Sequence, residues 1–263
     1  MRLLSIIQAA FVYPGFLGLC LGHDHSYPRV DHEQTLIDEP TSTNGIPFST
    51  RVYWMRQANL ALGHPCPKAP FGTVIVNHTA NSGLGELVCT GVNSRSATGN
   101  PTLHGEIAAI NNCTQILTNP SGPYKLSPKE ALAAFADLSL YTNAESCSMC
   151  ASAVRFAGFR EYVYGTSIGT LVESGWDQIE IPSAEVFRRS SGLPSSSTLI
   201  ADVLTNETDP LFAWQNDPEY PCPRGCSRVG GRCEANAVNQ TAIVVRLRRS
   251  SILAGIGGSG RLV

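Results

Sequence analysis

Two short segments of the sequence hold side chains that could act together on one metal ion. His104, Gly105 and Glu106 form the first segment, and Cys147 and Cys150 lie three positions apart in the second. Two thiolates on one helical turn can bind the same Zn²⁺, and a histidine from another element can supply a third ligand. Because three protein ligands leave a fourth position open to water, the pattern predicts a catalytic zinc site with ligands His104, Cys147 and Cys150.

Glu106 is the candidate proton carrier at this site. A bound Zn²⁺ lowers the pKa of water towards roughly 7, and the positive ends of two helices would add to that effect. Glu106 lies two residues from His104 and is not needed as a ligand. It can therefore take the proton of the water and pass it to a substrate nitrogen and then to departing ammonia.

Each segment alone has a simpler explanation. In a chain that passes through an oxidising compartment, the run Cys147-Ser148-Met149-Cys150 is more often a local disulfide or redox pair than a zinc site. The triplet beginning at His104 indicates very little on its own. The two segments together, each at a predicted helix start, favour the metal site.

The hydrophobic pattern predicts an α/β domain around these segments. Apolar residues at three- or four-residue steps indicate helices, with Ser49 or Thr50 capping the first and Asn100-Pro101 opening the second. We expect helices at residues 50–62, 100–117, 131–136 and 147–156, and strands at residues 71–76, 87–92, 138–142 and 161–165. The first two strands form a hairpin, and the strand–helix–strand order after them predicts a parallel crossover and hence a mixed sheet. Helical or loop material is expected from there to about Trp214.

Residues 1–22 have the features of a cleaved signal peptide. An almost uncharged apolar run extends from Leu3 to Leu21 and ends at Gly22, before polar residues. A membrane anchor is the alternative, because about 18 apolar residues can cross a bilayer. Pro14 and the small residues at the exit favour cleavage instead. We therefore expect a secreted, extracellular protein with no membrane association after cleavage.

The remaining chain divides into three parts. Residues 23–45 are polar and aperiodic, which predicts a flexible arm whose histidines His23, His25 and His32 are solvated rather than metal ligands. Residues 46–217 form the predicted catalytic domain, and residues 218–263 form a cysteine-bearing extension. The extension ends in a Gly/Ser-rich tail.

The cysteine count agrees with secretion. The sequence holds nine cysteines, and removal of Cys20 with the signal and of Cys147 and Cys150 to the metal leaves an even number. The remaining cysteines are compatible with disulfides, although the connectivity cannot be read from the sequence. They are Cys66, Cys89, Cys113, Cys222, Cys226 and Cys233. The last three lie close together in a segment with little to bury, so we expect them in disulfides, with at least one pairing outside the trio.

Sequons at Asn77, Asn206 and Asn239 lie in polar stretches and predict N-glycosylation on an extracellular route. Asn112 is a weaker candidate, because its sequon contains Cys113 and lies inside a predicted helix. Charge favours a small molecule as the partner. The formal net charge is −2, so no excess of Lys and Arg is available to bind nucleic-acid phosphates.

Both motifs lie in segments similar to the cytidine and deoxycytidylate deaminase superfamily. The matching runs, from about residue 48 to about residue 170, are YWMRQANLAL, APFGTVIV, TGVNSRSATGNPTLHGEIAAI and LYTNAESCSMCASAV followed by YVYG. H-x-E followed by C-x-x-C is the signature of zinc deaminases, and C-x-M-C resembles the guanine deaminase and tRNA adenosine deaminase branch. The resemblance implies a three-layer fold with a mixed sheet flanked by helices, a bound Zn²⁺ and a homodimer.

The resemblance also assigns roles to individual positions. Asn93 takes the place of an asparagine that binds the substrate, although a plain turn residue is an equal alternative. Gly105 stands where alanine is usual and is expected beside the substrate, and Ser146 stands where proline usually precedes the first cysteine. Both replacements mainly present backbone, so the resemblance implies that the metal is retained.

Three hypotheses about function remain open at this point. The leading one is hydrolysis of an exocyclic amine of a nucleobase, nucleoside or related heterocycle to a carbonyl with release of ammonia, guanine-like purines first. A tRNA substrate is disfavoured by the acidic balance and the secretory route. The alternatives are a deaminase of a non-nucleobase secondary metabolite and a secreted interaction protein that keeps zinc as a scaffold without catalysis. A sequence without the proton-carrying carboxyl group would favour the non-catalytic interaction protein, but Glu106 is present.

Overall fold

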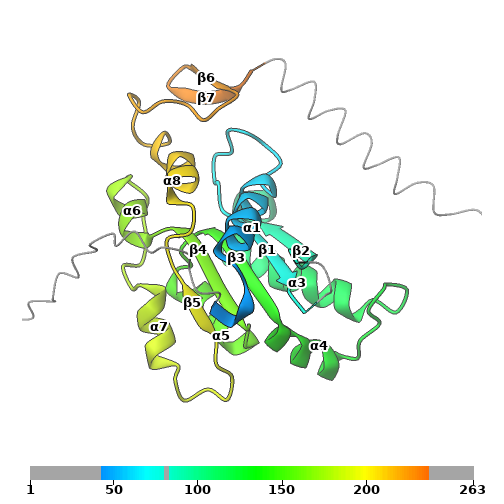
Figure 1. Ribbon diagram of the computed structural model, residues 1–263. Coiled ribbons are helices and arrows are strands. Elements are labelled where there is room, and N and C mark those ends of the chain that lie inside the picture. Colours follow the sequence, from blue (N-terminus) through cyan, green and yellow to red (C-terminus); the bar gives the residue numbers. More distant parts are fainter. Residues whose placement is uncertain (1–42, 80–82, 237–263) are drawn as a thin grey trace, which may run out of the picture. The chain divides into compact units, whose positions relative to one another are not determined.

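The computed structural model describes residues 43–79 and 83–236. The predicted signal peptide, most of the predicted arm with its three histidines, and Asn239 lie outside the described residues. Within them, a mixed five-stranded sheet forms the centre, with helices on both faces (Figure 1). The α/β fold predicted from the sequence is therefore confirmed.

The sheet combines an antiparallel hairpin with a parallel half. Its strands are β1 (Gly72–Asn77), β2 (Glu86–Val92), β3 (Leu138–Ala144), β4 (Glu161–Thr166) and β5 (Thr198–Ile200). Their order across the sheet is β2-β1-β3-β4-β5. β1 pairs antiparallel with both β2 and β3, whereas β3, β4 and β5 run parallel. This arrangement confirms the predicted hairpin and the predicted parallel crossover through the helix between β3 and β4.

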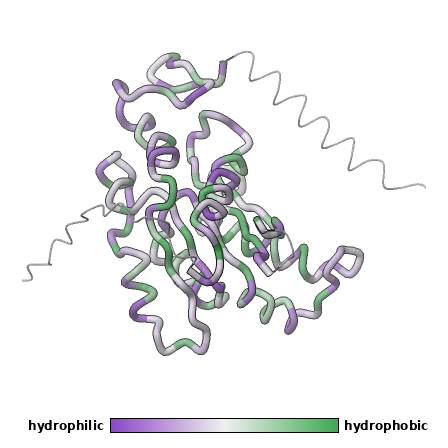
Figure 2. Tube along the Cα trace, viewed as in Figure 1, coloured by the Kyte–Doolittle hydropathy of each residue, from purple (hydrophilic) through white to green (hydrophobic). Residues whose placement is uncertain are grey.

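One face of the sheet is covered by α1 (Phe48–Leu60). Met55 and Ala58 of α1 pack against Val74 and Tyr141, which point to this face from β1 and β3. Side chains alternate between the two faces of a strand, so the residues next to Val74 and Tyr141 point to the opposite layer. The central strands are correspondingly among the most hydrophobic segments in Figure 2.

The opposite face is covered by α3 (Gly105–Thr118), α4 (Pro128–Ala134) and α5 (Ser148–Ala157). Ile75 and Leu140 of the sheet pack in one core cluster with Ala109 of α3 and Val154 of α5. The central strands are buried on both faces: β3 and β4 are buried along their whole length, and β1 is buried at every position but its last. The two helices that carry the predicted site are thus packed side by side on this face.

Shorter elements complete the described chain. They are η1 (Thr43–Gly45), α2 (Arg95–Thr98), η2 (Phe135–Asp137), α6 (Ile168–Glu173), α7 (Ser183–Arg189), α8 (Thr205–Ala213) and a two-stranded hairpin of β6 (Cys226–Val229) and β7 (Arg232–Ala235). None of the helices in the described part of the chain is long and apolar enough to span a bilayer.

Three local expectations were wrong. The second helix begins at Gly105 and not at Asn100, because the Asn100 side chain accepts hydrogen bonds from the Thr102 backbone N–H at 3.0 Å and hydroxyl at 2.8 Å and forms a turn. The first helix begins at Phe48 with Pro47 as its cap residue, so neither Ser49 nor Thr50 caps it. The short strand β5 was not predicted at all.

The three disulfides involve all the described cysteines outside the predicted metal site. Cys89–Cys113 joins β2 to α3, Cys222–Cys233 closes the C-terminal hairpin, and Cys66–Cys226 joins that hairpin to the loop after α1. The expectation that Cys222, Cys226 and Cys233 are disulfide-bonded, with one partner outside the trio, is confirmed.

Candidate active site

The first turns of α3 and α5 bring the two motifs together. His104 is the cap residue of α3, and Cys147 is the cap residue of α5, which follows directly after β3. The Cys147 Sγ lies 3.7 Å from the His104 Nδ1. The ligand atoms of His104, Cys147 and Cys150 all lie within 4.8 Å of one another. The structure therefore groups the three predicted ligands at two helix N-termini.

The chemistry of these donor atoms fits a zinc ion. Neither Cys147 nor Cys150 is in a disulfide, which argues against the alternative of a local Cys147–Cys150 pair. The hydrogen bond from Cys150 lowers the pKa of Cys147 to about 4. The pKa of Cys150 is raised by its hydrogen bond to the Cys147 thiolate and by burial. Two sulfurs this close can both be thiolates only beside a cation, which is what a divalent metal held by two cysteines and one histidine provides.

Glu106 is buried one helical position beyond the start of α3, with 5% of its surface exposed. Its Oε1 accepts a hydrogen bond from the Ser146 hydroxyl at 2.6 Å. Burial raises the pKa of Glu106 above its ordinary value, and the hydrogen bond from Ser146 opposes that rise. A buried carboxyl group held at one oxygen beside the ligands has the placement that a proton carrier needs.

Ser146 does more than its sequence position indicated. We expected this residue mainly to present backbone, and the structure adds a side-chain role, since its hydroxyl donates to Glu106. Its backbone N–H also donates to the Tyr162 hydroxyl at 2.7 Å, which ties the residue to β4. Only the departure from proline marked Ser146 in the sequence, because its partner Glu106 lies 40 positions away.

A cavity of about 760 Å³ opens onto these residues. Two aromatic side chains, Phe71 and Trp176, line it and contact each other edge to face at a centroid distance of 5.3 Å. Polar side chains border the rest of the cavity beside His104, Glu106 and Cys147: Asn93, Arg95, Ser96, Glu145, Asp177 and Gln178. The cavity thus combines aromatic surface with a few polar groups, as small-molecule sites commonly do.

Asn93 is a turn residue that also lines the cavity, and its contact with a substrate stays a prediction. Its Oδ1 accepts a hydrogen bond from the Arg95 backbone N–H at 3.2 Å, which is a turn contact. The same residue lines the cavity just after β2. Its backbone N–H donates to the carbonyl of Phe71 at 3.0 Å, so the two lining residues are held together.

Gly105 faces β1 rather than the cavity. It is not among the cavity-lining residues, and a Cβ built on it would lie 2.9 Å from the carbonyl oxygen of Phe71 and 3.1 Å from the Thr73 hydroxyl. Glycine at this position therefore allows the start of α3 to approach β1 closely. A contact between Gly105 and the substrate stays a prediction.

Glu145 is a cavity residue that we had not predicted. It is buried beside the site, and its Oε1 accepts from the Ser183 N–H at 2.7 Å and from the Ser183 hydroxyl at 2.7 Å. Its Oε2 accepts from the Ile168 N–H at 2.8 Å. One carboxylate therefore fixes the starts of α6 and α7 to the loop that carries Cys147. The segment between these helices contains Trp176 of the cavity wall.

Asn77 and Asn206, the two predicted glycosylation sites among the described residues, are not part of the cavity lining. Asn77 ends β1, where its Oδ1 accepts from the backbone N–H and hydroxyl of Thr79, and Asn206 is exposed in α8. At Asn112, the side-chain Nδ2 donates to the Thr90 carbonyl at 2.9 Å. That nitrogen is the atom a glycan would need, which agrees with the lower expectation for this sequon.

Residues 49–166 match the family model of the cytidine and deoxycytidylate deaminase zinc-binding region. The match spans both motifs and all the strands from β1 to β4. The match covers a little under half of the chain, and over this region the chain is similar to the cytidine and deoxycytidylate deaminase superfamily. This similarity supports a hydrolytic deaminase, and the matched zinc-binding region contains all three predicted metal ligands.

Three individual proteins are similar to this chain. A guanine deaminase of Bacillus subtilis (strain 168) is 28% identical over 153 residues, which are 56% of this chain and 80% of that protein. A solved guanine deaminase from Nitrosomonas europaea is 19% identical, with a TM-score of 0.46 over 65% of this chain and 84% of that one. A tRNA:A34 deaminase structure is 20% identical, with a TM-score of 0.42 over 60% of this chain and 98% of that one.

Proposed function

We propose that this deaminase hydrolyses the exocyclic amino group of a small nucleobase or related heterocycle, with guanine-like purines as the first candidates. The observation that carries the proposal is that His104, Cys147 and buried Glu106 line a cavity together with two aromatic side chains, while Cys150 completes the group of ligand atoms. The similarity to a bacterial guanine deaminase supports the choice of purines.

Glu106 carries the protons in the proposed reaction. Zn²⁺ held by His104, Cys147 and Cys150 would act as a Lewis acid and make water a nucleophile at neutral pH. Water adds to the ring carbon that bears the amino group, and Glu106 takes the proton that this water loses. Glu106 delivers this proton to the adjacent ring nitrogen. It then transfers the proton of the newly added hydroxyl group to the amino group, so that a carbonyl forms, the carbon–nitrogen bond breaks and ammonia departs. The Ser146 hydroxyl occupies Oε1 throughout, which directs Oε2 to the reacting atoms.

The cavity walls supply binding and orientation. Phe71 and Trp176 offer aromatic surface on which a planar ring can pack. Asn93 uses its Oδ1 in the turn, so its Nδ2 is the group that can donate to a ring acceptor. Asp177 and Gln178 place a carboxylate and an amide at the cavity edge, where they can accept from ring N–H groups. A flat heterocycle with donors on one edge and acceptors on the other fits these groups.

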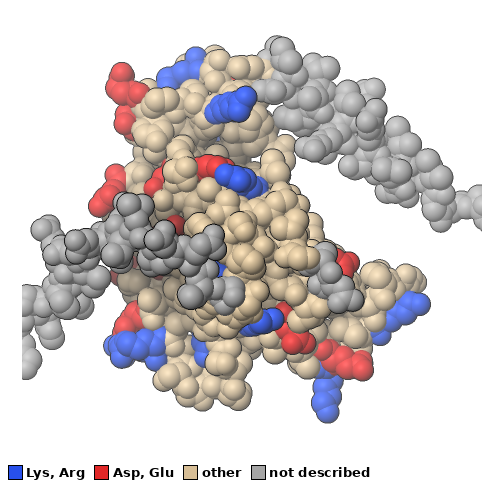
Figure 3. All heavy atoms as spheres, in the orientation of Figure 1, with Lys and Arg blue, Asp and Glu red and all other residues tan. Residues whose placement is uncertain are grey.

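The proposed function includes the location of the protein, the kind of substrate and the oligomeric state. We infer that the protein is secreted and extracellular, since the apolar N-terminus, the sequons and the disulfides agree with one another. The charged groups of both signs are interspersed over the face drawn in Figure 3, which favours a small substrate over a polyanion. We also propose that the protein is a homodimer, as the resemblance to the superfamily implies.

A substrate panel tests the proposed function. Purified secreted protein with measured zinc content is incubated with guanine, adenine, cytosine, their nucleosides and non-nucleobase cyclic amidines, and ammonia is measured. The proposal expects about one zinc per chain and the fastest release from guanine or a guanine-like purine. Turnover of a non-nucleobase amidine alone would support the secondary-metabolite alternative. Zinc without turnover of any amine would support the scaffold alternative.

A further inference from the structure

The C-terminal hairpin is bonded covalently to a loop that leads into the active-site cavity. Cys226 of β6 forms a disulfide with Cys66, which lies between α1 and β1 at a sequence separation of 160. Three residues beyond Cys66 in the chain, Ala69 begins the cavity lining, and Phe71 continues it. The extension is therefore attached directly to a wall of the substrate site.

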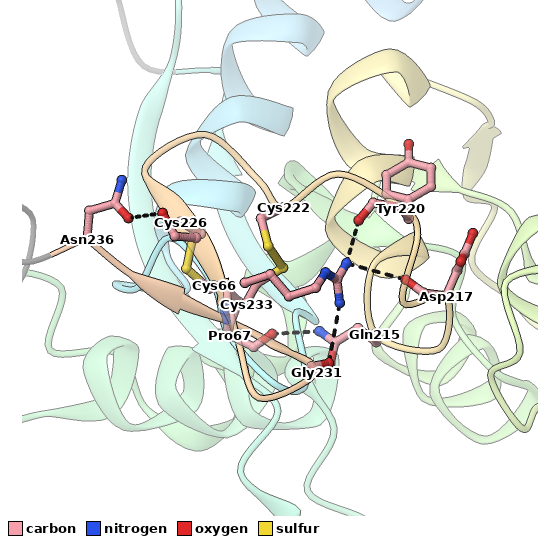
Figure 4. Close-up of a disulfide and its surroundings, with 12 residues drawn as sticks. Cys66, Pro67, Gln215, Asp217, Tyr220, Cys222, Cys226, Gly231, Cys233 and Asn236 are labelled. Carbon is pink, nitrogen blue, oxygen red and sulfur yellow. Dashed lines mark hydrogen bonds between the residues drawn. A yellow bond between two sulfur atoms is a disulfide. The ribbon is translucent and has the colours of Figure 1, made fainter.

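Several contacts besides the disulfide hold this junction (Figure 4). Gln215 follows α8 and donates from its Nε2 to the Pro67 carbonyl at 2.7 Å. Cys66 is 4% exposed and packs with Trp214 and Cys233 in one buried cluster. The start of the loop is thus held by the extension through the disulfide, and by Gln215, which lies between α8 and the extension.

The extension has its own internal support. The Cys222–Cys233 disulfide joins the segment before β6 to β7. The Arg228 guanidinium donates to the carbonyls of Tyr220 and Gly231, which ties the hairpin turn to the preceding chain (Figure 4). The hairpin can therefore act as a rigid anchor even though it is small.

The other end of the loop is held by the catalytic domain. The Asn143 side chain of β3 donates to the Pro70 carbonyl at 2.7 Å and accepts from the Gly72 N–H at 2.9 Å. Phe71 lies between these two contacts in the chain, and its ring packs against Trp176 and against Phe212 of α8, at centroid distances of 5.3 and 5.1 Å. The loop that precedes Phe71 is thus anchored by β3 at Pro70 and by the extension at Cys66, and Ala69 lies between the two anchors.

We propose that the C-terminal extension, together with Gln215 in the chain that leads into it, is a brace for the loop beside the substrate site, and that Cys66 is a positioning residue for Ala69. The proposal rests on the proposed function, since it assigns Ala69 to substrate binding. Loss of the Cys66–Cys226 bond releases the loop from 62 to 69 and lets this part of the cavity wall adopt several positions. Substrate affinity then falls, while the zinc ligands and Glu106, which are held by α3 and α5, stay in place.

Two cysteine-pair variants distinguish a brace from general stabilisation. Cys66→Ser with Cys226→Ser removes the bond to the loop, and Cys222→Ser with Cys233→Ser removes the bond within the hairpin as the matched control. We expect the first variant to raise KM about tenfold, with kcat within about twofold of wild type and zinc content unchanged, which is the pattern of lost uniform binding. We expect the control to keep a KM near that of wild type.

Hydrogen exchange gives a second readout that does not need a substrate. Amides at residues 62–71 should exchange faster in the Cys66/Cys226 variant than in wild type, and those in the control should not. Equal KM and equal exchange in wild type and the Cys66/Cys226 variant would overturn the brace, as would equal effects in both variants. If wild type deaminates no amine on the panel, the proposed function fails, and the exchange result still decides the brace.

A third variant decides the question if the Cys66/Cys226 variant does not fold. Gln215→Ala keeps every disulfide and removes only the hydrogen bond to the Pro67 carbonyl. The brace predicts faster exchange at residues 66–69 and a KM increase of about two- to threefold at unchanged kcat. Unchanged exchange and KM in Gln215→Ala would then contradict it.

Discussion

The four residues proposed to carry the chemistry lie at the start of a helix or within its first turn. His104 and Cys147 cap two helices, Cys150 follows within one turn of Cys147, and Glu106 follows His104 by two positions. These relations are local, so the sequence alone could predict them from spacing and helix geometry. The partners of Ser146 and Glu145 come from other elements, and nothing in a single sequence indicates those contacts.

Ser146→Ala tests whether the hydroxyl orients the proton carrier. The variant removes the 2.6 Å hydrogen bond to Glu106 and leaves the backbone of the ligand loop intact. A hydrogen bond to a charged group contributes about 1.5–3 kcal/mol, so we expect kcat to fall at least about tenfold with KM nearly unchanged and zinc retained. Steady-state kinetics with zinc analysis measures this.

Ser146→Thr is the matched control, because it keeps the hydroxyl at the same position of the chain. We expect it to retain more of the kcat than Ser146→Ala does. Wild-type kcat in Ser146→Ala, or loss of zinc from it, would show that the hydroxyl does not position Glu106.

At the scale of elements, the sheet and its main helices were predictable because their hydrophobic periods are clear. The start of α3 was misplaced because Asn100-Pro101 can open either a helix or a turn, and the side-chain bonds to Thr102 decide for the turn. β5 was missed because it has three residues and pairs only with β4. Its strand conformation depends on that neighbour more than on its own sequence.

Glu145→Gln tests how α6 and α7 are attached to the ligand loop. The Glu145 carboxylate accepts from three donors, and an amide would turn one acceptor oxygen into a donor that faces an N–H group. Leaving a buried donor unsatisfied costs about 1–3 kcal/mol, so we expect a loss of that size in the free energy of unfolding. A higher KM is expected as well, because Trp176 lies between the two helices.

Denaturant unfolding and steady-state kinetics measure both effects of Glu145→Gln. Glu180→Gln is the control, since Glu180 is exposed in the same segment between α6 and α7. Equal stability of the two variants would mean that Glu145 does not hold these helices.

For the whole molecule, a deaminase domain is combined with three disulfides and with predicted N-glycosylation sites. The disulfides agree with an oxidising compartment, and the longest-range one, Cys66–Cys226, joins the domain to the extension. Its pairing could not be predicted from the sequence, because six cysteines allow 15 connectivities. The superfamily could be identified from two motifs, whereas the attachment of the extension to the cavity required the three-dimensional arrangement.

Expression through a secretory pathway tests the predicted processing. We expect the mature chain to begin near His23 and to carry glycan on at least one of Asn77, Asn206 and Asn239, with none on Asn112, whose Nδ2 is bonded to the Thr90 carbonyl. Mass spectrometry before and after enzymatic deglycosylation measures both features. An intact Met1 on the secreted product would contradict the signal peptide, and a glycan on Asn112 would contradict the assignment of that side chain. Sedimentation velocity of the same material tests the predicted homodimer.

The central claim is that Glu106 transfers protons and the other three residues bind zinc. It is tested most directly by the ammonia released by Glu106→Gln at measured zinc occupancy, with Cys150→Ala beside it. The amide keeps the size of the side chain but cannot cycle a proton, so we predict full zinc and a loss of about 10²- to 10⁴-fold in kcat. Cys150→Ala should lose zinc and stability together. Near wild-type turnover in Glu106→Gln, or a loss of zinc as complete as that of Cys150→Ala, would contradict the mechanism.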